Sequence, residues 1–487
     1  MKLGDLLKLA GISCNENTDV EISGVSYNSL KTQPGELFVC ISGFSTDGHK
    51  YAKSAQEAGA AAILAERSLE EVSIPVIIVE NGRKALSAVS AAFYGRPSDR
   101  MEVFGVTGTN GKTTISYLLR NIVEAAGHQC GVLGTIAYVY GGKTFESVNT
   151  TPESFELQRM FYEMKEEYGI SYCAMEVSSH SLALSRTDDI SFNHSVFTNL
   201  TPDHMDFHTD FEDYFAAKKK LFQQTSGASV INIDDEYGKR LYNELLAENK
   251  KAFSCSIDDE TAYYRAVILD SSANGTNADI YAGENRLGTV KINTPGRFSV
   301  ANAICAIGVT LEAGIPWEAV KSGIEQTRGV SGRFESVENS HGIPVIVDYA
   351  HTPDALEKII KTAREFTTGR VITVFGCGGD RDATKRPIMG EVAGTYSDFC
   401  VVTSDNPRTE DPYKILDDIV PGISKTDCLY EVVEDRRRGI KRALKEYQPG
   451  DTVIIAGKGH ENYQIIGKVK HHFDDKETAM QIIEQEL

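Results

Sequence analysis

Short apolar runs along the chain end repeatedly in glycine or polar residues. The clearest case is the run 103–106, which enters the glycine-containing turn 108–111; Lys112 and two threonines then lead into the amphipathic stretch 115–126. A short apolar run predicts a buried strand, and an apolar face recurring at helical spacing predicts a helix. The pattern therefore predicts a strand, a tight loop and a helix in succession.

Residues 1–98 alternate strand and helix patterns and form the first predicted domain. We expect strands at 37–41 and 75–79, and a helix over the alanine-rich segment 52–65. The turn-forming sequence Gly-Arg-Pro-Ser at 95–98 predicts the end of this domain.

Residues 99–330 form the second predicted domain, which begins with the strand, loop and helix described above. Later apolar runs at 172–177, 195–198 and 228–233 are separated by helical patterns, which is typical of a mostly parallel sheet. Segment 265–295 has shorter strand patterns and Asn/Gly turns, so we expect hairpins there.

Residues 331–487 form the third predicted domain, a second array of strands and helices. Its strands are expected at 343–347, 371–375, 399–403 and 453–456, with helices such as 353–366 between them. The chain is therefore predicted to be an α/β protein of three domains. These are an N-terminal α/β domain, a central P-loop-type domain with a mostly parallel sheet, and a C-terminal Rossmann-like domain.

Composition and charge exclude several classes of protein. The 487 residues are 41% hydrophobic and 24% charged, and the formal net charge of −19 argues against nonspecific binding to nucleic acid or anionic membranes. The nine cysteines are scattered without a Cys-x-x-Cys pair, which favours reduced thiols in a cytoplasm. No apolar run reaches the ~18 residues of a membrane span, and we expect no signal peptide.

The turn 108–111 has the composition of a phosphate-binding loop. Its glycines allow backbone N–H groups to close around phosphate oxygens, and the following helix adds its dipole. In such loops a lysine, here Lys112, reaches the terminal phosphates, and the next hydroxyl, here Thr113, binds Mg²⁺. The strict pattern has glycine where this chain has Val106, so the loop is a variant, and a glycine turn without nucleotide is the alternative.

Polar residues also follow two later strands of the second domain. Glu176 ends one of them, and a carboxylate at that point is placed to bind Mg²⁺ beside the phosphates. Helix capping by Ser178 and Ser179 is the alternative role of this cluster. His204, in the polar segment after the next strand, is a candidate contact to a divalent ion or a phosphate.

Each strand of the third domain is followed by a polar or glycine-rich cluster. The clusters lie at 348–351, 376–382, 405–408 and 457–461. Because the carboxyl ends of parallel strands meet at one edge of a sheet, we expect them to converge. Arg381 and Arg408 suit a carboxylate, and Asp405 and Glu461 suit an amine, which indicates a pocket for a zwitterionic amino acid. Salt bridges within the protein are the alternative.

Together these residues resemble the Mur ligase family, the ATP-dependent amide-forming enzymes of peptidoglycan precursor synthesis, over essentially the whole chain. The matching motifs are 108–114, 149–152, 176–180, Thr198-Asn199 with Asp203-His204, Asn302, Arg333 and 348–353. The resemblance implies ATP and Mg²⁺ as cofactors and a first domain that binds a uridine diphosphate sugar. It also implies that the substrates are UDP-N-acetylmuramoyl-L-alanyl-D-glutamate, meso-diaminopimelate and ATP.

The resemblance assigns roles to individual residues. The implied ATP contacts are Gly108, Thr109, Asn110, Gly111, Lys112, Thr113, Thr114, Asn302, Arg333, Asp348 and His351. The implied catalytic and metal-binding residues are Lys112, Thr113, Glu176, His204 and Lys218. Lys218 would carry a carbamate formed from CO₂, whereas the lysine triplet 218–220 taken by itself predicts only a solvated face of the predicted helix 211–224.

The implied contacts to the nucleotide sugar are Ser26, Ser29, Asn149, Thr150, Thr151, Ser178 and Arg186. The family usually has Asp-Ser-Arg in the first-domain motif, where this chain has Asn28, Ser29 and Leu30 after Tyr27, so the individual uridine contacts are left open. A glutamine found in some relatives is Leu184 here.

The implied contacts to the added amino acid are Arg381, Asp405, Asn406, Pro407, Arg408, Gly457 and Glu461. Relatives that add L-lysine replace the arginine of the 405–408 motif, so Arg408 favours meso-diaminopimelate. The physics agrees, because an arginine fork matches the extra carboxylate of diaminopimelate and repels the ammonium of lysine.

Other functions remain as alternatives. An L-lysine-adding relative would lack Arg408, and a folylpolyglutamate synthetase-like ligase would not need residues 1–98. A nucleotide switch or motor would have no use for a zwitterion pocket. We expect a cytoplasmic monomer that binds no nucleic acid and does not insert into a membrane.

Overall fold

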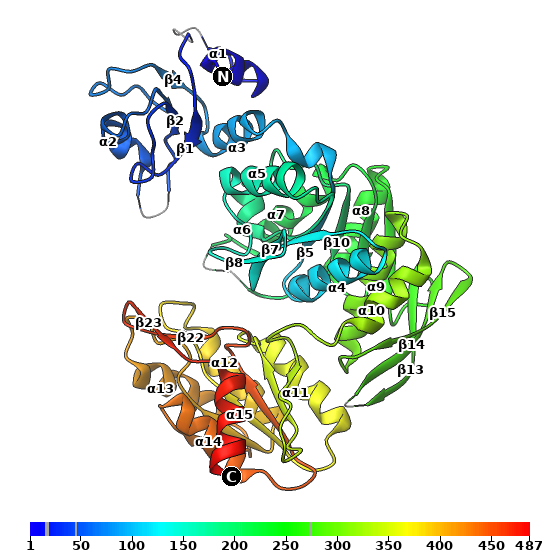
Figure 1. Cartoon of the computed structure of the whole chain (residues 1–487). Coiled ribbons are helices and arrows are strands. Elements are labelled where there is room, and N and C mark those ends of the chain that lie inside the picture. Colours follow the sequence, from blue (N-terminus) through cyan, green and yellow to red (C-terminus); the bar gives the residue numbers. More distant parts are fainter. Residues whose placement is uncertain (15–18, 44–45, 204, 206, 273) are drawn as a thin grey trace.

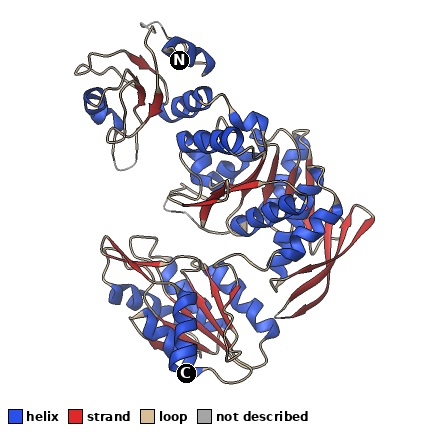
Figure 2. Cartoon of the chain, viewed as in Figure 1, coloured by secondary structure: helices blue, strands red, loops and turns tan. Residues whose placement is uncertain are grey.

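The computed structural model describes residues 1–487 except 15–18, 44–45, 204, 206 and 273. Three α/β domains follow one another along the chain, and the central one lies between the other two (Figure 1). Helices and strands alternate through most of each domain (Figure 2). Among the described residues, none of the helices combines the length and apolar character that crossing a membrane requires.

The first domain is a small parallel sheet with helices around it. Its elements are α1 (Leu3–Leu9), β1 (Gly24–Ser26), β2 (Glu36–Val39), the 3-10 helix η1 (Gly48–Tyr51), α2 (Ala52–Glu57), β3 (Ala62–Ala65), β4 (Val76–Ile78) and α3 (Gly82–Phe93). The four strands pair in parallel in the order β1-β2-β3-β4. A short 3-10 helix, η2 (Pro97–Arg100), leads out of the domain.

The helix predicted over 52–65 is wrong in its second half. The helix ends at Glu57, and Gly59 follows with φ +100°. Ala62–Ala65 is instead the buried strand β3, paired on both sides. A central strand of a parallel sheet is buried on both faces, so its apolar run cannot be told from a buried helix by periodicity.

The central domain contains the longest sheet. Its elements are β5 (Glu102–Thr107), α4 (Lys112–Ala125), β6 (Cys130–Leu133), β7 (Ala137–Tyr140), β8 (Lys143–Glu146), α5 (Ser154–Tyr162), the π-helical turn η3 (Glu163–Glu167), β9 (Tyr172–Glu176), α6 (Ser179–Ala183), β10 (His194–Phe197), α7 (Phe211–Gln224), β11 (Ser229–Asn232), α8 (Glu236–Ala247), β12 (Ala252–Ser256), β13 (Tyr264–Ser272), β14 (Gly275–Ala282), β15 (Asn285–Ile292), α9 (Arg297–Glu312) and α10 (Trp317–Gln326). The eleven strands run in the order β15-β14-β13-β12-β11-β10-β5-β9-β6-β7-β8.

Strand β5 lies inside the sheet between β10 and β9, and all three are parallel. The polar residues that follow these strands therefore meet at one edge, as the sequence predicted. The hairpins expected within 265–295 are confirmed as the antiparallel strands β13, β14 and β15. The other end of the sheet is the antiparallel pair β7 and β8.

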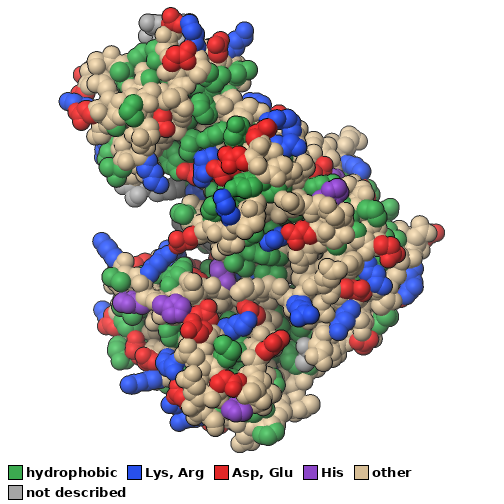
Figure 3. All heavy atoms as spheres, viewed as in Figure 1, with side chains coloured by type: hydrophobic (Ala, Val, Ile, Leu, Met, Phe, Trp, Pro, Cys, Tyr) green, Lys and Arg blue, Asp and Glu red, His purple; other side chains and the backbone are tan. Residues whose placement is uncertain are grey.

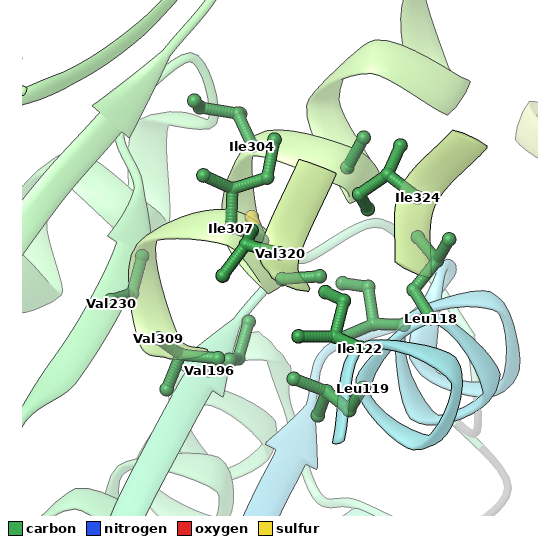
Figure 4. Close-up of a cluster of buried hydrophobic side chains, with 14 of the residues drawn as sticks. Leu118, Leu119, Ile122, Val196, Val230, Ile304, Ile307, Val309, Val320 and Ile324 are labelled. Atoms are coloured by element: carbon green, nitrogen blue, oxygen red, sulfur yellow. The ribbon is translucent and has the colours of Figure 1, made fainter. Parts of the chain in front are cut away.

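Apolar packing fixes helix α4 against this sheet. Figure 4 shows side chains of α4, α9 and α10 in one cluster with side chains of β10 and β11: Leu118, Leu119, Ile122, Ile304, Ile307, Val309, Val320, Ile324, Val196 and Val230. All of them are buried, most of them completely. Because α4 cannot shift without opening this core, the loop before it is held in place at the carboxyl end of β5.

The third domain is a second, mostly parallel α/β array. Its elements are β16 (Glu335–Ser336), β17 (Val345–Asp348), α11 (Pro353–Phe366), β18 (Val371–Phe375), α12 (Lys385–Tyr396), β19 (Phe399–Val402), α13 (Pro412–Ile423), β20 (Leu429–Val432), α14 (Arg436–Glu446), β21 (Thr452–Ala456), β22 (Tyr463–Ile466), β23 (Val469–His472) and α15 (Asp475–Glu486). Strand order is β16-β17-β21-β18-β19-β20, with β22 and β23 as a separate hairpin.

Helix α11 shows how local chemistry sets an element. Its bounds are those predicted from the sequence, because the Thr352 side chain caps the N–H of Ala355 and Pro353 occupies the first turn. The α/β fold class with three domains and largely parallel sheets is confirmed.

Candidate active site

A cavity of about 270 Å³ lies between the central and third domains. Figure 3 shows the surface hollowed between these two domains. The central domain contributes the loop before α4, Glu176 and Asn302, and the third domain contributes Arg333 and residues 348–351. The residues predicted to contact ATP thus come together in one pocket, apart from Gly108, which lies buried just behind it.

The two loop glycines adopt backbone conformations and close approaches that a side chain would not tolerate. Gly108 has φ +142°, and a Cβ there would lie 1.8 Å from Thr198 Oγ1. Gly111 has φ +92°, and its Cβ would lie 2.4 Å from Asn302 Oδ1. The loop can therefore pass close to the predicted adenine contact Asn302 only as glycine.

Lys112 folds back over its own loop. Its Nζ donates to the carbonyl oxygens of Gly108 and Thr109, both at 2.8 Å. Burial lowers the pKa of Lys112, and the nearby carboxylates of Glu176 and Asp203 partly offset this effect. The lysine amine is thus held against the loop at the wall of the pocket.

Glu176 is buried at the carboxyl end of β9. Its carboxylate accepts from the backbone N–H of Thr135 at 2.9 Å and from the Thr135 hydroxyl at 3.0 Å. Nothing local indicated Thr135, which lies 41 residues from Glu176 in the chain. Both residues line the pocket together with Thr113.

The donor set fits a hard divalent cation. Mg²⁺ prefers oxygen ligands and is usually bound through one or two carboxylates together with substrate phosphates. The Thr113 hydroxyl and the Glu176 carboxylate supply such oxygens at the pocket wall. In the described part of the chain no group of three or more His, Cys, Asp or Glu side chains forms a metal site, and His204 lies outside the described residues.

Lys218 is buried inside the protein, contrary to the solvated face that its lysine-rich sequence suggested. Its Nζ donates to the Gly108 carbonyl at 2.9 Å and lies 4.5 Å from the ring centroid of Tyr214. Burial, reinforced by the positive charge of Lys112, brings the pKa of Lys218 well below its ordinary value. The neighbouring Lys219 instead pairs with Glu244 and Glu248.

The third-domain wall of the pocket contacts the loop directly. An Arg333 guanidinium nitrogen donates to the Thr113 hydroxyl at 3.2 Å. Asp348 accepts from the backbone N–H of Phe334 at 2.6 Å, and burial raises its pKa. Burial and the nearby Lys385 lower the pKa of His351, which favours the neutral imidazole.

Asp354 is a contact that sequence reasoning missed. It lies at the start of α11, and its carboxylate accepts from the Asn110 side-chain amide at 3.0 Å. This hydrogen bond joins the third domain to the phosphate loop. An acidic residue in the first turn of a helix looks purely structural in sequence, so nothing local indicated this role.

The clusters at the strand ends of the third domain do converge. Asn406 Nδ2 donates to Glu461 Oε2 at 2.8 Å, and the Gly457 N–H donates to the Asp348 carbonyl at 3.0 Å. Asp405 Oδ2 is buried and has no hydrogen-bond partner among the described residues. A Cβ on Gly457, whose φ is +118°, would lie 2.6 Å from that oxygen. An unpartnered buried carboxylate oxygen suits a bound ammonium group.

Lys458, fully buried beside this cluster, was not among the predicted contacts. Its Nζ donates to Asn406 Oδ1 and to Glu461 Oε2, both at 3.1 Å. The amide and the carboxylate are therefore held in fixed orientations.

Arg408 has a strained backbone that is supported by the β22–β23 hairpin. Its φ is +52°, its N–H donates to the Ile465 carbonyl at 3.0 Å, and its carbonyl accepts from Gly467 at 2.7 Å. The guanidinium donates to the Gly379 carbonyl at 2.8 Å. Arg381, on the loop after β18, is exposed. Both arginines lie near Gly378, because a Cβ there would be 2.9 Å from an Arg408 guanidinium nitrogen and 3.9 Å from Arg381 Cγ.

The predicted contacts to the nucleotide sugar are spread over two domains. Ser26 is buried and shares a hydrogen bond with Thr32 at 3.1 Å, whereas Ser29 is half-buried. In the central domain, Thr150 and Ser178 line the pocket, and the Thr151 carbonyl accepts from Arg186 at 2.9 Å. Asn149 is held through its backbone by the Tyr138 hydroxyl.

Three family models match the chain. They are the Mur ligase family, catalytic domain at residues 21–94, the Mur ligase middle domain at 106–310, and the Mur ligase, glutamate ligase domain at 332–459. The fold and the site together define an ATP-dependent ligase that forms amide bonds. The chain belongs to the Mur ligase family.

Relatives extend over the whole chain. A protein of Clostridioides difficile (strain 630) named UDP-N-acetylmuramoyl-L-alanyl-D-glutamate–2,6-diaminopimelate ligase is 48% identical, covering 98% of this chain and 99% of its own. A protein of the same name from Clostridium botulinum (strain ATCC 19397 / Type A) is 45% identical over 100% of both. A solved structure with this name in its title has a TM-score of 0.71 and 30% identity, covering 99% of both chains.

Proposed function

We propose that this ligase joins meso-2,6-diaminopimelate to UDP-N-acetylmuramoyl-L-alanyl-D-glutamate, with ATP as the energy source, in peptidoglycan precursor synthesis. The observation that carries the proposal is the cluster formed by Asp405, Asn406, Arg408 and Glu461 beside the nucleotide pocket. It offers negative oxygens for an amine and a guanidinium for a carboxylate. Proteins named for this reaction are 42–48% identical to the chain.

In the first step, the side-chain carboxylate of the substrate's D-glutamate attacks the γ-phosphorus of ATP. An oxygen–phosphorus bond forms, the bond to the β–γ bridging oxygen breaks, and ADP leaves with that electron pair. The loop N–H groups and Lys112 neutralise charge on the transferring phosphoryl group. Two Mg²⁺ ions would add further neutralisation. Thr113 would hold one of them, and Glu176, His204 and a carbamate on Lys218 would hold the second.

In the second step, an amine of diaminopimelate that has lost its proton to the medium attacks the acyl carbon. A carbon–nitrogen bond forms, the carbon–oxygen bond to phosphate breaks with its electron pair on oxygen, phosphate leaves, and the nitrogen gives up one further proton to the medium. Asp405 and Glu461 would orient ammonium groups, while Arg408 would hold the far carboxylate. Lysine lacks that carboxylate, and its terminal ammonium would meet Arg408 as a like charge.

Contacts between the domains would help to keep water from the acyl phosphate. Two hydrogen bonds cross the cleft: Arg333 donates to the Thr113 hydroxyl, and the Asn110 amide donates to Asp354. Asn302, Asp348 and His351 would complete the ATP site. Such closure protects a reactive intermediate from hydrolysis. We further propose that the chain works as a cytoplasmic monomer without nucleic acid, consistent with its net charge of −19.

Phosphate release measured with the nucleotide sugar, ATP and Mg²⁺, adding meso-diaminopimelate or L-lysine in separate reactions, tests the proposal. Turnover with diaminopimelate but not lysine is expected. Turnover with lysine but not with diaminopimelate would support a ligase activity and contradict the proposed role of Arg408. If no phosphate is released with either amino acid, the proposed substrates are wrong, and the folylpolyglutamate synthetase-like alternative is favoured.

A further inference from the structure

The first and central domains meet at helices α3 and α5, which lie next to each other (Figure 1). Arg83 is in the first turn of α3, and Glu153 immediately precedes α5. An Arg83 guanidinium nitrogen lies 3.3 Å from Glu153 Oε2. This ion pair joins a first-domain residue to the central domain.

The same oxygen of Glu153 also lies 3.3 Å from Arg186 Nε. Arg186 is the residue predicted to hold the dipeptide end of the nucleotide sugar, and it also donates to the Thr151 carbonyl at 2.9 Å. The side chains of Arg83, Glu153 and Arg186 are 18%, 13% and 16% exposed. Because they are largely removed from water, their attraction is stronger than that of a surface pair.

A second contact crosses the same interface. The Tyr27 hydroxyl donates to both carboxylate oxygens of Glu156, each at 3.0 Å. Tyr27 lies between Ser26 and Ser29, the predicted uridine contacts, and Glu156 lies on the first turn of α5. The start of helix α5 therefore has contacts in both directions. Glu156, on the helix, bonds Tyr27 beside the predicted uridine contacts, and Glu153, just before the helix, pairs with Arg186.

We propose that Glu153 and Glu156 are positioning residues that fix the distance between the uridine site and the dipeptide site, with Arg83 and Tyr27 as their first-domain partners. This inference rests on the proposed function. A ligand bound at both ends gains affinity from the effective concentration of the second site, and that gain depends on how firmly the two sites are held apart. UDP alone occupies one end and gains nothing from the contact.

Calorimetric titration of the full-length protein with UDP-N-acetylmuramoyl-L-alanyl-D-glutamate and, separately, with UDP tests the inference. Arg83→Gln and the nearly isosteric Glu153→Gln are expected to weaken binding of the nucleotide sugar about tenfold and to leave the Kd for UDP within about twofold. Tyr27→Phe is expected to act in the same direction. The rate at saturating nucleotide sugar should change little, so KM rises while kcat stays.

Arg100→Gln is the matched control. Arg100 pairs with Glu166 at 2.7 Å in the same region, but both side chains are well exposed, at 50% and 38%. This variant should bind both ligands like the wild type. Equal weakening of UDP and nucleotide sugar in Arg83→Gln and Glu153→Gln, or no weakening of either, would overturn the inference. A wild type that binds UDP but not the nucleotide sugar would overturn the proposed function itself.

Discussion

The side-chain amines of Lys112 and Lys218 meet at one atom, the carbonyl oxygen of Gly108. Lys112 approaches it to 2.8 Å and Lys218 to 2.9 Å, although the residues lie on different helices. Two ammonium groups this close repel each other, and burial lowers the pKa of both. Lys218 has the larger shift, which increases the share of its amine in the neutral form, and that form reacts with CO₂ to give a carbamate.

Replacing Lys218 by alanine is expected to lower kcat by about two orders of magnitude, because a charge-neutralising contact in the phosphoryl-transfer site is lost. Added acetate or formate should restore part of the rate by supplying a carboxylate in the vacated space. Lys219→Ala, which removes a lysine paired with Glu244 and Glu248, is the control and should retain activity. Full activity in Lys218→Ala would refute the role of the carbamate.

Arg408→Ala is expected to raise KM for diaminopimelate by about one to two orders of magnitude, since charge-assisted hydrogen bonds to a carboxylate are lost. The KM for ATP should stay within about twofold, because Arg408 is not part of the nucleotide pocket. Arg437→Ala, which removes a surface arginine paired with Glu486, is the control. Equal effects on both KM values would contradict the pocket assignment.

Gly111→Ala is expected to raise KM for ATP at least about tenfold, because the new Cβ must displace Asn302 or the loop. Gly127→Ala is the control that separates the effect of backbone strain at positive φ from the effect of a steric clash with neighbouring atoms. Gly127 has a similar φ of +85°, but nothing lies within 4 Å of its Cβ position. The Gly127→Ala variant should lose about 1 kcal/mol of stability and have an unchanged KM for ATP. If both variants bind ATP normally, the contact of Gly111 with Asn302 has no part in nucleotide binding.

His460 is expected to make the protein less stable at acid pH. Burial, helped by the nearby Arg333, His351 and Lys458, lowers its pKa to about 4. The unfolded chain takes up this proton below pH ~6.5, whereas the folded chain does not until about pH 4. As the pH is lowered between these two values, the free energy of unfolding decreases by on the order of 1.4 kcal/mol per pH unit for this group.

Melting temperatures of the wild type and His460→Gln, measured by calorimetry from pH 7 to pH 4.5, test this expectation. The wild type should lose more stability than the variant as pH falls through this window. His472→Gln, at an exposed histidine on β23, is the control and should follow the wild type. Parallel curves for wild type and His460→Gln would show that the burial of His460 does not couple to stability.

The sequence predicted the fold best where local pattern and tertiary role agree. Helices 211–224 and 353–366 have the predicted bounds, because caps and apolar spacing define them locally. The segment 62–65 was wrong, since a strand buried on both faces has no alternation to read. The hairpin β22–β23 was not foreseen, because three of the four residues of β23 are polar or charged.

The residues of the candidate site likewise fall into those that the sequence could predict and those that it could not. The phosphate loop and Glu176 could be read from the sequence, since each follows a strand whose end faces the site. Lys218 could be singled out only through the family resemblance, because its burial depends on Gly108, 110 residues away. Asp354 contacts Asn110, and Lys458 contacts Asn406, across separations of 244 and 52 residues that no spacing rule connects. Contacts made by tertiary packing leave no local signature.

The buried cores of the three domains are built from separate stretches of chain. The residues at their centres fall within 3–92, 101–324 and 334–483. Each stretch can therefore collapse as it leaves the ribosome, without waiting for the next. The nucleotide pocket, by contrast, needs residues from Thr109 to Ile359. A nascent chain in which only the first two domains have folded thus has the phosphate loop but only one wall of the pocket. The pocket for ATP is complete only once the third domain has been synthesised and has folded.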